Sequence, residues 1–305
     1  MVTIAESVGL NGANKTVDVI KIQNLINNNA RHTELVSPLT VTGKINGELI
    51  DAIKAFQANH PDLRFSSPDG RIDPDGKTLA MLRESIKNHE SYLPSGFSRN
   101  HFTSFDSDTF VELYESQYSY PRLGVAAKQG LQNLLKQLNA DSDVTDIRWA
   151  AYMLATVKHE CANTWQPIEE YGKGRNYDYG HPVRVLDPSD STGRRVHLNT
   201  YYGRGYVQLT WASNYRKMDA ALGLSGNGSL YLYPQNALDP DTAYRIMSYG
   251  MRNGTFTGKK LGDYIRGDYV DYRNARRIIN GTDQAQIIKG YADNIEFLLR
   301  FCNSI

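Results

Sequence analysis

The sequence predicts a mainly α-helical protein with two domains, on three observations. The chain has 305 residues, more than one hydrophobic core usually serves. Several segments place apolar residues three or four positions apart, the spacing of one helix face. The composition also changes near residue 90, because residues 1–90 contain no Tyr and no Trp while all 20 Tyr and all 3 Trp follow. Residues 91–105 include Pro, Gly and several Ser without helical periodicity, and are predicted to link the domains.

The first domain, residues 1–90, is predicted to contain three short helices. Their apolar stripes are Val19, Ile22, Leu25 and Ile26; Leu49, Ala52, Ile53 and Phe56, in a run that Pro61 ends; and Leu79, Leu82 and Ile86. Between the second and third helices, SPDGRIDPDGKT carries two Asp-Gly pairs and predicts a series of tight turns. A three-helix domain this small is expected to have no concave pocket with paired titratable groups, so binding is expected of it rather than catalysis.

The second domain is predicted to contain a buried helix with the sequence IRWAAYMLATVKHE. Thr145 or Asp143 is positioned to cap its start. Glu160 stands at its other end, where apolar neighbours and the negative end of the helix dipole favour a protonated carboxyl. A general acid needs that state. The alternatives are a solvated glutamate or one paired with Lys158 or Arg148.

The composition argues against several classes of function. A net charge of +1 offers no strong attraction for nucleic acid or anionic membranes. Cys161 and Cys302 are too few for a disulfide framework and are expected to be reduced, packed thiols. His159 begins an HExxH-like pattern, but Asn163 occupies the place of the second histidine, so no metal or other cofactor is expected. The N-terminus shows no secretory leader, which predicts synthesis in a cytoplasm.

Three segments of the second domain carry the groups that a sugar-binding cleft uses. Glu169 follows Glu160 by nine positions in KHECANTWQPIEE. The segment YYGRGYVQLTWASNY and the later RRIING supply aromatic faces, amides and hydroxyls, which suit a polysaccharide. The same residues are also common in protein interfaces and in packed cores. Composition alone therefore does not distinguish a sugar-binding cleft from these two alternatives.

In this order, the three segments resemble the catalytic domain of glycoside hydrolase family 19, chitinase-like enzymes with a lysozyme-type fold. The resemblance covers residues 110–302, and YYGRGYVQLT is its most specific part. It implies that Glu160 is the general acid, Glu169 the general base, and Thr210 a residue that holds the attacking water. The substrate-binding residues that it implies, including one histidine that orients its neighbours, are His159, Tyr201, Gln208, Asn214 and Asn280.

The sequence departs from the family pattern at several positions. Ser213 replaces a tyrosine before the asparagine of the block, and Tyr206 replaces a proline. Glu170, directly after Glu169, leaves the assignment of the base open; it can equally be a solvated neighbour or pair with Arg175. The inverting mechanism that the resemblance implies needs carboxyl groups about 6.5–9.5 Å apart.

Residues 5–88 resemble the peptidoglycan-binding-like domain, most specifically in PDGRIDPDGKT. A chain that joins this domain to a family 19 domain resembles a modular phage endolysin. The resemblance implies a peptidoglycan-degrading glycosidase over residues 106–305, an N-acetylmuramidase that acts as a monomer on the cell wall after release from the host cytoplasm. A lytic transglycosylase and a chitinase of the same fold are the alternatives, and a non-catalytic wall-binding protein is a third.

Overall fold

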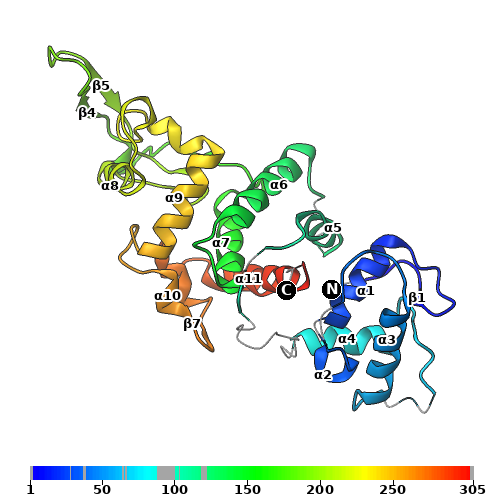
Figure 1. Ribbon diagram of the computed structural model, residues 1–305. Coiled ribbons are helices and arrows are strands. Elements are labelled where there is room, and N and C mark those ends of the chain that lie inside the picture. Colours follow the sequence, from blue (N-terminus) through cyan, green and yellow to red (C-terminus); the bar gives the residue numbers. More distant parts are fainter. Residues whose placement is uncertain are drawn as a thin grey trace. The chain divides into compact units, whose positions relative to one another are not determined.

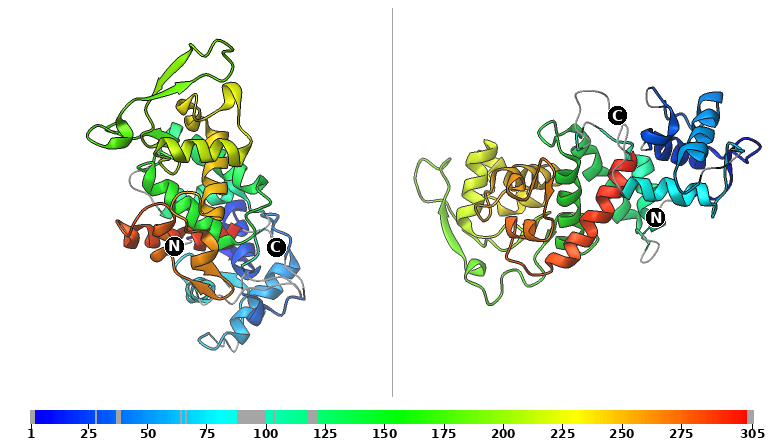
Figure 2. Two further views of the ribbon diagram at one scale, coloured as in Figure 1. Left: turned by 90° about the vertical axis from the view of Figure 1, so that its left-hand side faces the viewer. Right: turned by 90° about the horizontal axis from the view of Figure 1, so that it is seen from below.

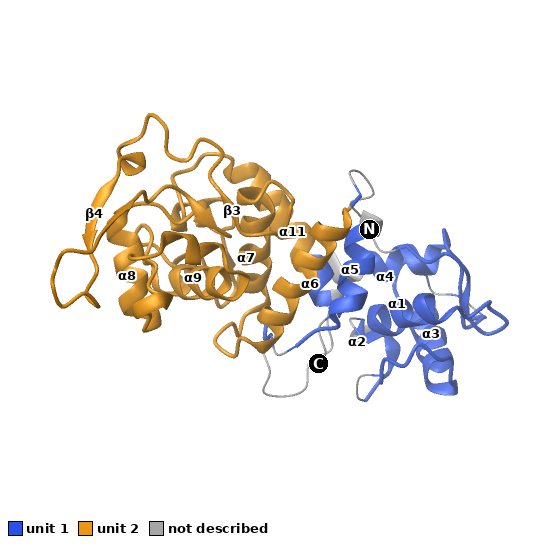
Figure 3. Cartoon of the chain, turned by 90° about the horizontal axis from the view of Figure 1, so that it is seen from above, with its two compact units in different colours: residues 1–122, 297–305 blue, residues 123–296 orange. Residues whose placement is uncertain are grey.

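The computed structural model describes residues 3–27, 29–36, 39–63, 65, 67–87, 100–102, 104–117 and 122–302. Helices make up most of its secondary structure, and the described strands are short and paired in twos (Figure 1). The mainly α-helical prediction is therefore confirmed. Two compact units are present, unit 1 with residues 1–122 and 297–305, and unit 2 with residues 123–296 (Figure 3).

The functional division at residues 90 and 105 stays a prediction, because most of the predicted linker lies outside the described residues. Within the described part of the chain, no helix combines the length and the apolar character that crossing a bilayer would require.

Unit 1 is a small helical body with one two-stranded sheet. Its elements are α1 (Thr16–Asn27), α2 (Ala30–Thr33), α3 (Gly47–Asn59), α4 (Lys77–Lys87), α5 (Ser107–Gln117), β1 (Val8–Gly9) and β2 (Arg71–Ile72). Helix α1 packs against α2, α3 and α4. The predicted stripes of α1 and α3 are buried, as are Leu79 and Leu82 of α4, whereas the side chain of Ile86 lies outside the described residues. The three predicted helices are confirmed; α2 and the β1–β2 pair were not predicted.

The Asp-Gly segment of unit 1 forms a turn, as its sequence predicts. Gly70 has a φ of +67°, a conformation that glycine adopts without strain. The Asp69 carboxylate accepts hydrogen bonds from the backbone N–H of Arg71 (3.0 Å) and from the side chain of Gln57 (2.7 Å). Asp69 and Gly70 therefore have a structural task in turning the chain into β2.

Unit 2 is a cluster of helices around α7. Its helices are α6 (Val125–Ala140), α7 (Ile147–Glu160), α8 (Ala212–Leu222), α9 (Pro240–Asn253), α10 (Leu261–Tyr264) and α11 (Ala285–Cys302), of which residues 297–302 belong to unit 1. Helix α9 packs against α6, α7 and α8 (Figure 1). The middle of α7 is buried, including the predicted stripe Ala150, Met153, Leu154 and Val157.

The start of α7 differs from the prediction. Asp146 is the N-cap residue, and its carboxylate accepts the backbone N–H of Arg148 at 2.9 Å. The caps predicted at Thr145 and Asp143 are wrong. The Asp146 carboxylate also pairs with the Arg148 guanidinium at 2.6 Å. This ion pair favours Asp146 over Thr145 and Asp143 as the N-cap residue.

The strands of unit 2 form three antiparallel pairs in its described residues, all of which lie between α7 and α11 in the sequence. They are β3 (Ile168–Glu169) with β6 (Arg204–Gly205), β4 (Val183–Leu186) with β5 (Val196–Asn199), and β7 (Ile265–Arg266) with β8 (Tyr269–Val270). Short 3₁₀ helices are η1 (Asp178–Gly180), η2 (Gly226–Gly228), η3 (Pro234–Leu238) and η4 (Asn274–Ile278). The β4–β5 hairpin extends away from the helices of this unit (Figure 2).

Candidate active site

A cavity of about 580 Å³ in unit 2 collects side chains from segments that are far apart in the sequence. Glu160 reaches it from the end of α7, and Glu170 from the residue after β3. The turn before α8 and the chain after α9 and η4 complete its walls. The other lining residues are Tyr177, Tyr179, Gly203, Val207, Gln208, Leu209, Thr210, Trp211, Asn214, Phe256, Thr257, Ile279 and Asn280.

Glu160 is held by a buried cation at the end of α7. The guanidinium of Arg276, from η4, donates a hydrogen bond to Glu160 Oε1 and forms an ion pair with it. Only 4% of the Arg276 side chain and 14% of the Glu160 side chain are exposed. Arg276 Nε donates to the carbonyl of Asp283 at 3.1 Å, which fixes the guanidinium. The ion pair of Glu160 is therefore with Arg276, and not with Lys158 or Arg148, the two partners considered from the sequence. Lys158 instead donates to Asn163 (2.7 Å) and Arg148 pairs with Asp146.

The glycines of the YYGRG segment allow a tight turn beside the strand pair β3–β6. Gly205 has a φ of +85°, and a Cβ there would lie 2.8 Å from the carbonyl oxygen of Ala237. A Cβ on Gly203 would lie 2.7 Å from Gln208 Oε1. The side-chain amide of Gln208 in turn donates to the carbonyls of Ile168 and Gly205, both at 3.1 Å. This turn therefore fixes β3, and with it the two glutamates at the end of β3.

The two adjacent glutamates have different surroundings. Glu169 accepts hydrogen bonds from Tyr202 Oη (2.6 Å) and Lys173 Nζ (2.8 Å), and Arg204 Nε lies 3.6 Å away. The hydrogen bond from Lys173, followed by that from Tyr202, lowers the pKa of Glu169. Glu169 is not among the residues that line the cavity, whereas Glu170 is.

Glu170 is held by one neutral hydroxyl and one backbone group. Tyr179 Oη donates to its Oε1 and Gly203 N to its Oε2, both at 3.0 Å. The backbone N–H of Glu170 also donates to the carbonyl of Gly203 at 2.7 Å. Burial, together with the bond to Glu170, raises the pKa of Tyr179 to about 12, so this hydroxyl remains a donor at neutral pH.

Four of the predicted site residues share the cavity with Glu160. Thr210, Gln208, Asn214 and Asn280 all line it. Asn214 Nδ2 donates to the carbonyl of Thr210 at 3.0 Å, and Asn280 Oδ1 accepts the backbone N–H of Gly281 at 2.8 Å. These bonds fix the two amides at the cavity wall.

Two predicted substrate-binding residues are not among those that line the cavity. Tyr201 is 1% exposed, donates from its hydroxyl to the carbonyl of Tyr231 at 2.7 Å, and stacks on the Tyr231 ring. Its position makes it a packing residue. His159 is half-buried at the end of α7, and this burial lowers the pKa of its imidazole. Neither residue is part of the cavity lining, and the substrate-binding role of each stays a prediction.

One wall of the cavity is aromatic and was not predicted from the sequence. The rings of Tyr177 and Tyr179 stack with centroids 5.1 Å apart, and Trp211 meets Tyr179 edge to face at 5.3 Å. Tyr177 and Trp211 are about half exposed, at 58% and 47%. Trp211 belongs to the block already singled out, whereas the tyrosines carry no sequence signal that distinguishes them from the other tyrosines. Flat, partly exposed rings of this kind bind the apolar faces of sugars.

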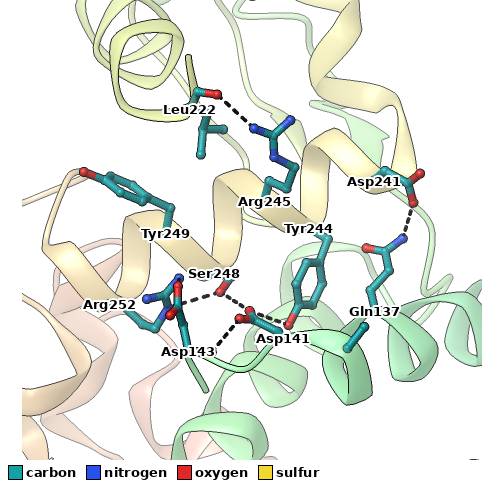
Figure 4. Close-up of a pocket in the computed structure, with 11 residues that line it drawn as sticks. Gln137, Asp141, Asp143, Leu222, Asp241, Tyr244, Arg245, Ser248, Tyr249 and Arg252 are labelled. Carbon is teal, nitrogen blue, oxygen red and sulfur yellow. Dashed lines mark hydrogen bonds and ion pairs between the residues drawn. The ribbon is translucent and has the colours of Figure 1, made fainter. Parts of the chain in front are cut away.

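A second cavity, of about 410 Å³, lies where α6, α8 and α9 meet (Figure 4). Its carboxylates all have partners: Asp141 accepts from Tyr244 (2.9 Å) and Ser248, and Asp143 pairs with Arg252 at 2.9 Å. Asp241 accepts from Gln137 at 2.7 Å. These contacts join α6 and the residues after it to α9, and Arg245 of α9 donates to the carbonyl of Leu222 of α8 at 2.9 Å. We therefore regard this cavity as structural.

The cysteines are packed, as predicted. Cys161 and Cys302 are free and buried, and burial raises the pKa of both thiols. Among the residues that the structure describes, no group of three or more His, Cys, Asp or Glu side chains is arranged to hold a metal ion.

No protein-family model and no curated protein matches the chain. Two solved structures similar to it are chitinase C from Streptomyces griseus HUT6037 and a bacterial family 19 chitinase. The first is 24% identical with a TM-score of 0.40, and the match covers 63% of this chain and 92% of that chain. The second is 21% identical with a TM-score of 0.38, and the match covers 64% of this chain and 94% of that chain.

Proposed function

We propose that this protein is a glycoside hydrolase that cleaves the β-1,4-linked glycan of bacterial peptidoglycan by an inverting acid–base mechanism. The observation that carries the proposal is the meeting of two carboxylates, Glu160 and Glu170, in one cavity with a hydroxyl, three amides and an aromatic wall. Glu160 is ion-paired with Arg276 in the free protein. In the proposed reaction it takes up a proton as the glycan enters the cavity and gives that proton to the leaving oxygen, and a carboxylate of the 169–170 pair activates the water.

Each part of the cavity has a task in this reaction. The aromatic wall binds the flat face of a sugar ring, and the amides of Asn214 and Asn280 suit the hydroxyl and N-acetyl groups of the glycan. Thr210 lies in the same cavity, where its hydroxyl can hold the attacking water. A metal-free hydrolysis of this type needs no cofactor.

The substrate assignment rests on the resemblance of residues 5–88 to a wall-binding domain. Chitin and peptidoglycan share N-acetylated β-1,4 chains, so the cavity alone does not choose between them. We propose that the protein acts as a monomeric endolysin: it is made in the host cytoplasm, and it reaches the wall after release. The bond that we expect it to cleave joins N-acetylmuramic acid to N-acetylglucosamine.

The first test compares Glu160→Gln with the wild type on purified cell walls. The substitution keeps the shape of the side chain and removes its proton, so turnover should fall by at least about 10²–10⁴-fold while wall binding persists. Glu112→Gln, an exposed change on α5, is the matched control and should leave turnover unchanged. A Glu160→Gln variant that retains more than about a tenth of the wild-type rate would remove Glu160 from the acid role.

The second test is mass spectrometry of digested peptidoglycan, with and without borohydride reduction. Hydrolysis at the expected bond leaves a reducible muramic end. A reducible glucosamine end would change the specificity and keep the mechanism, and faster cleavage of chitin would change the substrate. Anhydro-muramic ends would indicate a lytic transglycosylase, and intact glycan with free peptides would exclude a glycosidase.

A further inference from the structure

We propose that Glu170, rather than the Glu169 indicated by the family resemblance, is the general base that takes a proton from the attacking water. This inference rests on the glycosidase function proposed above and names the residue that performs one of its steps. The two residues are neighbours in the chain, so sequence spacing barely separates them, whereas the structure places them in different surroundings.

The geometry of β3 separates the two carboxylates. Successive side chains of an extended strand point to opposite sides. Glu169 lies opposite Arg204 in the register of β3 with β6, and its carboxylate stays with the side chains of Tyr202, Lys173 and Arg204. Glu170 follows directly and lines the cavity that also contains Glu160 and Thr210. Of the two, Glu170 is therefore the one placed to share a water with a substrate held in this cavity.

The partners of each carboxylate also suit different tasks. Glu169 is bound by one ammonium and lies near one guanidinium, and cations weaken a carboxylate as a base because they stabilise its charged form. Glu170 is held by the neutral Tyr179 hydroxyl and the Gly203 N–H, which orient it without adding a full charge. An ionised carboxylate offers about four acceptor sites, so sites remain for a water.

The step balances without a cofactor. Glu170 accepts one proton of the water as the water oxygen bonds to C1 of the sugar. The bond from C1 to the glycosidic oxygen breaks, and Glu160 gives its proton to that oxygen. The products are a new reducing end and a free hydroxyl. Glu170 ends protonated and Glu160 ionised, and exchange with solvent restores both.

The decisive experiment compares matched variants of the full-length protein on soluble, peptide-free peptidoglycan glycan strands. Glu170→Gln should lower kcat by about 10²–10⁴-fold with little change in KM, whereas Glu169→Gln should keep kcat within about tenfold of wild type. Tryptophan fluorescence during urea unfolding checks that each variant folds. Activity lost on Glu169→Gln and kept on Glu170→Gln would overturn the inference.

Rescue by azide separates a base from a supporting residue. In Glu170→Ala, azide can occupy the space of the lost carboxylate and attack C1 itself, while Glu160 still protonates the leaving oxygen. The product is a glycosyl azide with inverted configuration, detectable by mass spectrometry and NMR. Glu169→Ala should form none. The inference fails if azide restores Glu169→Ala, or if it restores neither variant while the wild type cleaves glycan and Glu160→Gln does not. A wild type that cleaves no glycan would instead refute the proposed function.

Discussion

The ion pair between Arg276 and Glu160 provides a quantitative test of how the candidate site is built. Arg276→Met keeps much of the side-chain volume and leaves the Glu160 carboxylate, 14% exposed, without its cation. Removing one partner of a buried pair costs about 3–5 kcal/mol, because the remaining charge stays desolvated. The partial exposure of Glu160 places the expected loss in the free energy of unfolding near the lower end, at about 3 kcal/mol.

The double variant Glu160→Gln/Arg276→Met distinguishes a direct pair from two independent losses. It contains no unpaired charge, so its destabilisation should fall short of the sum of the single variants by about 1–3 kcal/mol. Arg277→Met, an exposed change in the same 3₁₀ helix, is the control and should stay within about 0.5 kcal/mol of wild type.

Urea unfolding followed by tryptophan fluorescence is the appropriate assay. Trp149, Trp165 and Trp211 are the only tryptophans of the chain, and all three lie in unit 2, so the signal reports the unit that contains the pair. The reasoning is refuted if Arg276→Met is as stable as Arg277→Met, or if the two single effects simply add in the double variant.

Three further predictions concern the cap, the second acid and the first domain. Asp146→Ala removes the N-cap of α7 and should lower the stability of unit 2 by about 1 kcal/mol or more in the same urea assay; an unchanged midpoint would contradict the cap. Lys173→Met removes the main cause of the lowered pKa of Glu169. The lowered pKa stabilises the folded protein at a pH above the pKa of Glu169 in the unfolded chain, about 4.3, and this stabilisation is lost as the pH falls through the folded-state pKa. The stability difference between wild type and this variant should therefore shrink between pH 7 and pH 3, and a constant difference would count against the assignment. Deleting residues 1–90 should reduce cleavage of intact walls more than cleavage of soluble fragments, because tethering raises local concentration; equal losses would mean that these residues belong to the catalytic unit.

Four helices, α1, α3, α4 and α7, could be predicted from the sequence because their apolar residues repeat at helical spacing, whereas the other described helices were not predicted individually. The stripes of α1, α3 and α7 repeat at helical spacing, and all are buried. The strand pairs β1–β2, β3–β6 and β7–β8 could not be predicted, since a strand of two residues is too short to show a period of two. The capping residue of α7 was misplaced for a related reason: several polar residues precede the helix, and the choice of Asp146 depends on its additional ion pair with Arg148.

The site could be predicted as a set of segments, but the role of each side chain depended on tertiary contacts. Sequence spacing put Glu160 near the cavity, yet its partner Arg276 lies 116 positions further along the chain. The roles of the aromatic residues in YYGRGYVQLTWASNY could not be predicted either. Tyr201, which was expected to bind sugar, is buried against Tyr231, whereas Trp211 lines the cavity.

The direction of β3 decides which of the two carboxylates lines the cavity, and that direction is fixed by residues outside β3. Gln208 bonds to the carbonyl of Ile168, and the register opposes Glu169 to Arg204. A shift of β3 by one residue in its pairing with β6 would exchange the surroundings of the two glutamates, because adjacent side chains of a strand face opposite sides. The turn after β6 therefore determines, together with the two carboxyl groups, which glutamate is placed to act as the base. For this reason Gln208, although it lines the cavity, acts first as a positioning residue: losing its amide bonds should disturb Glu169 and Glu170 together.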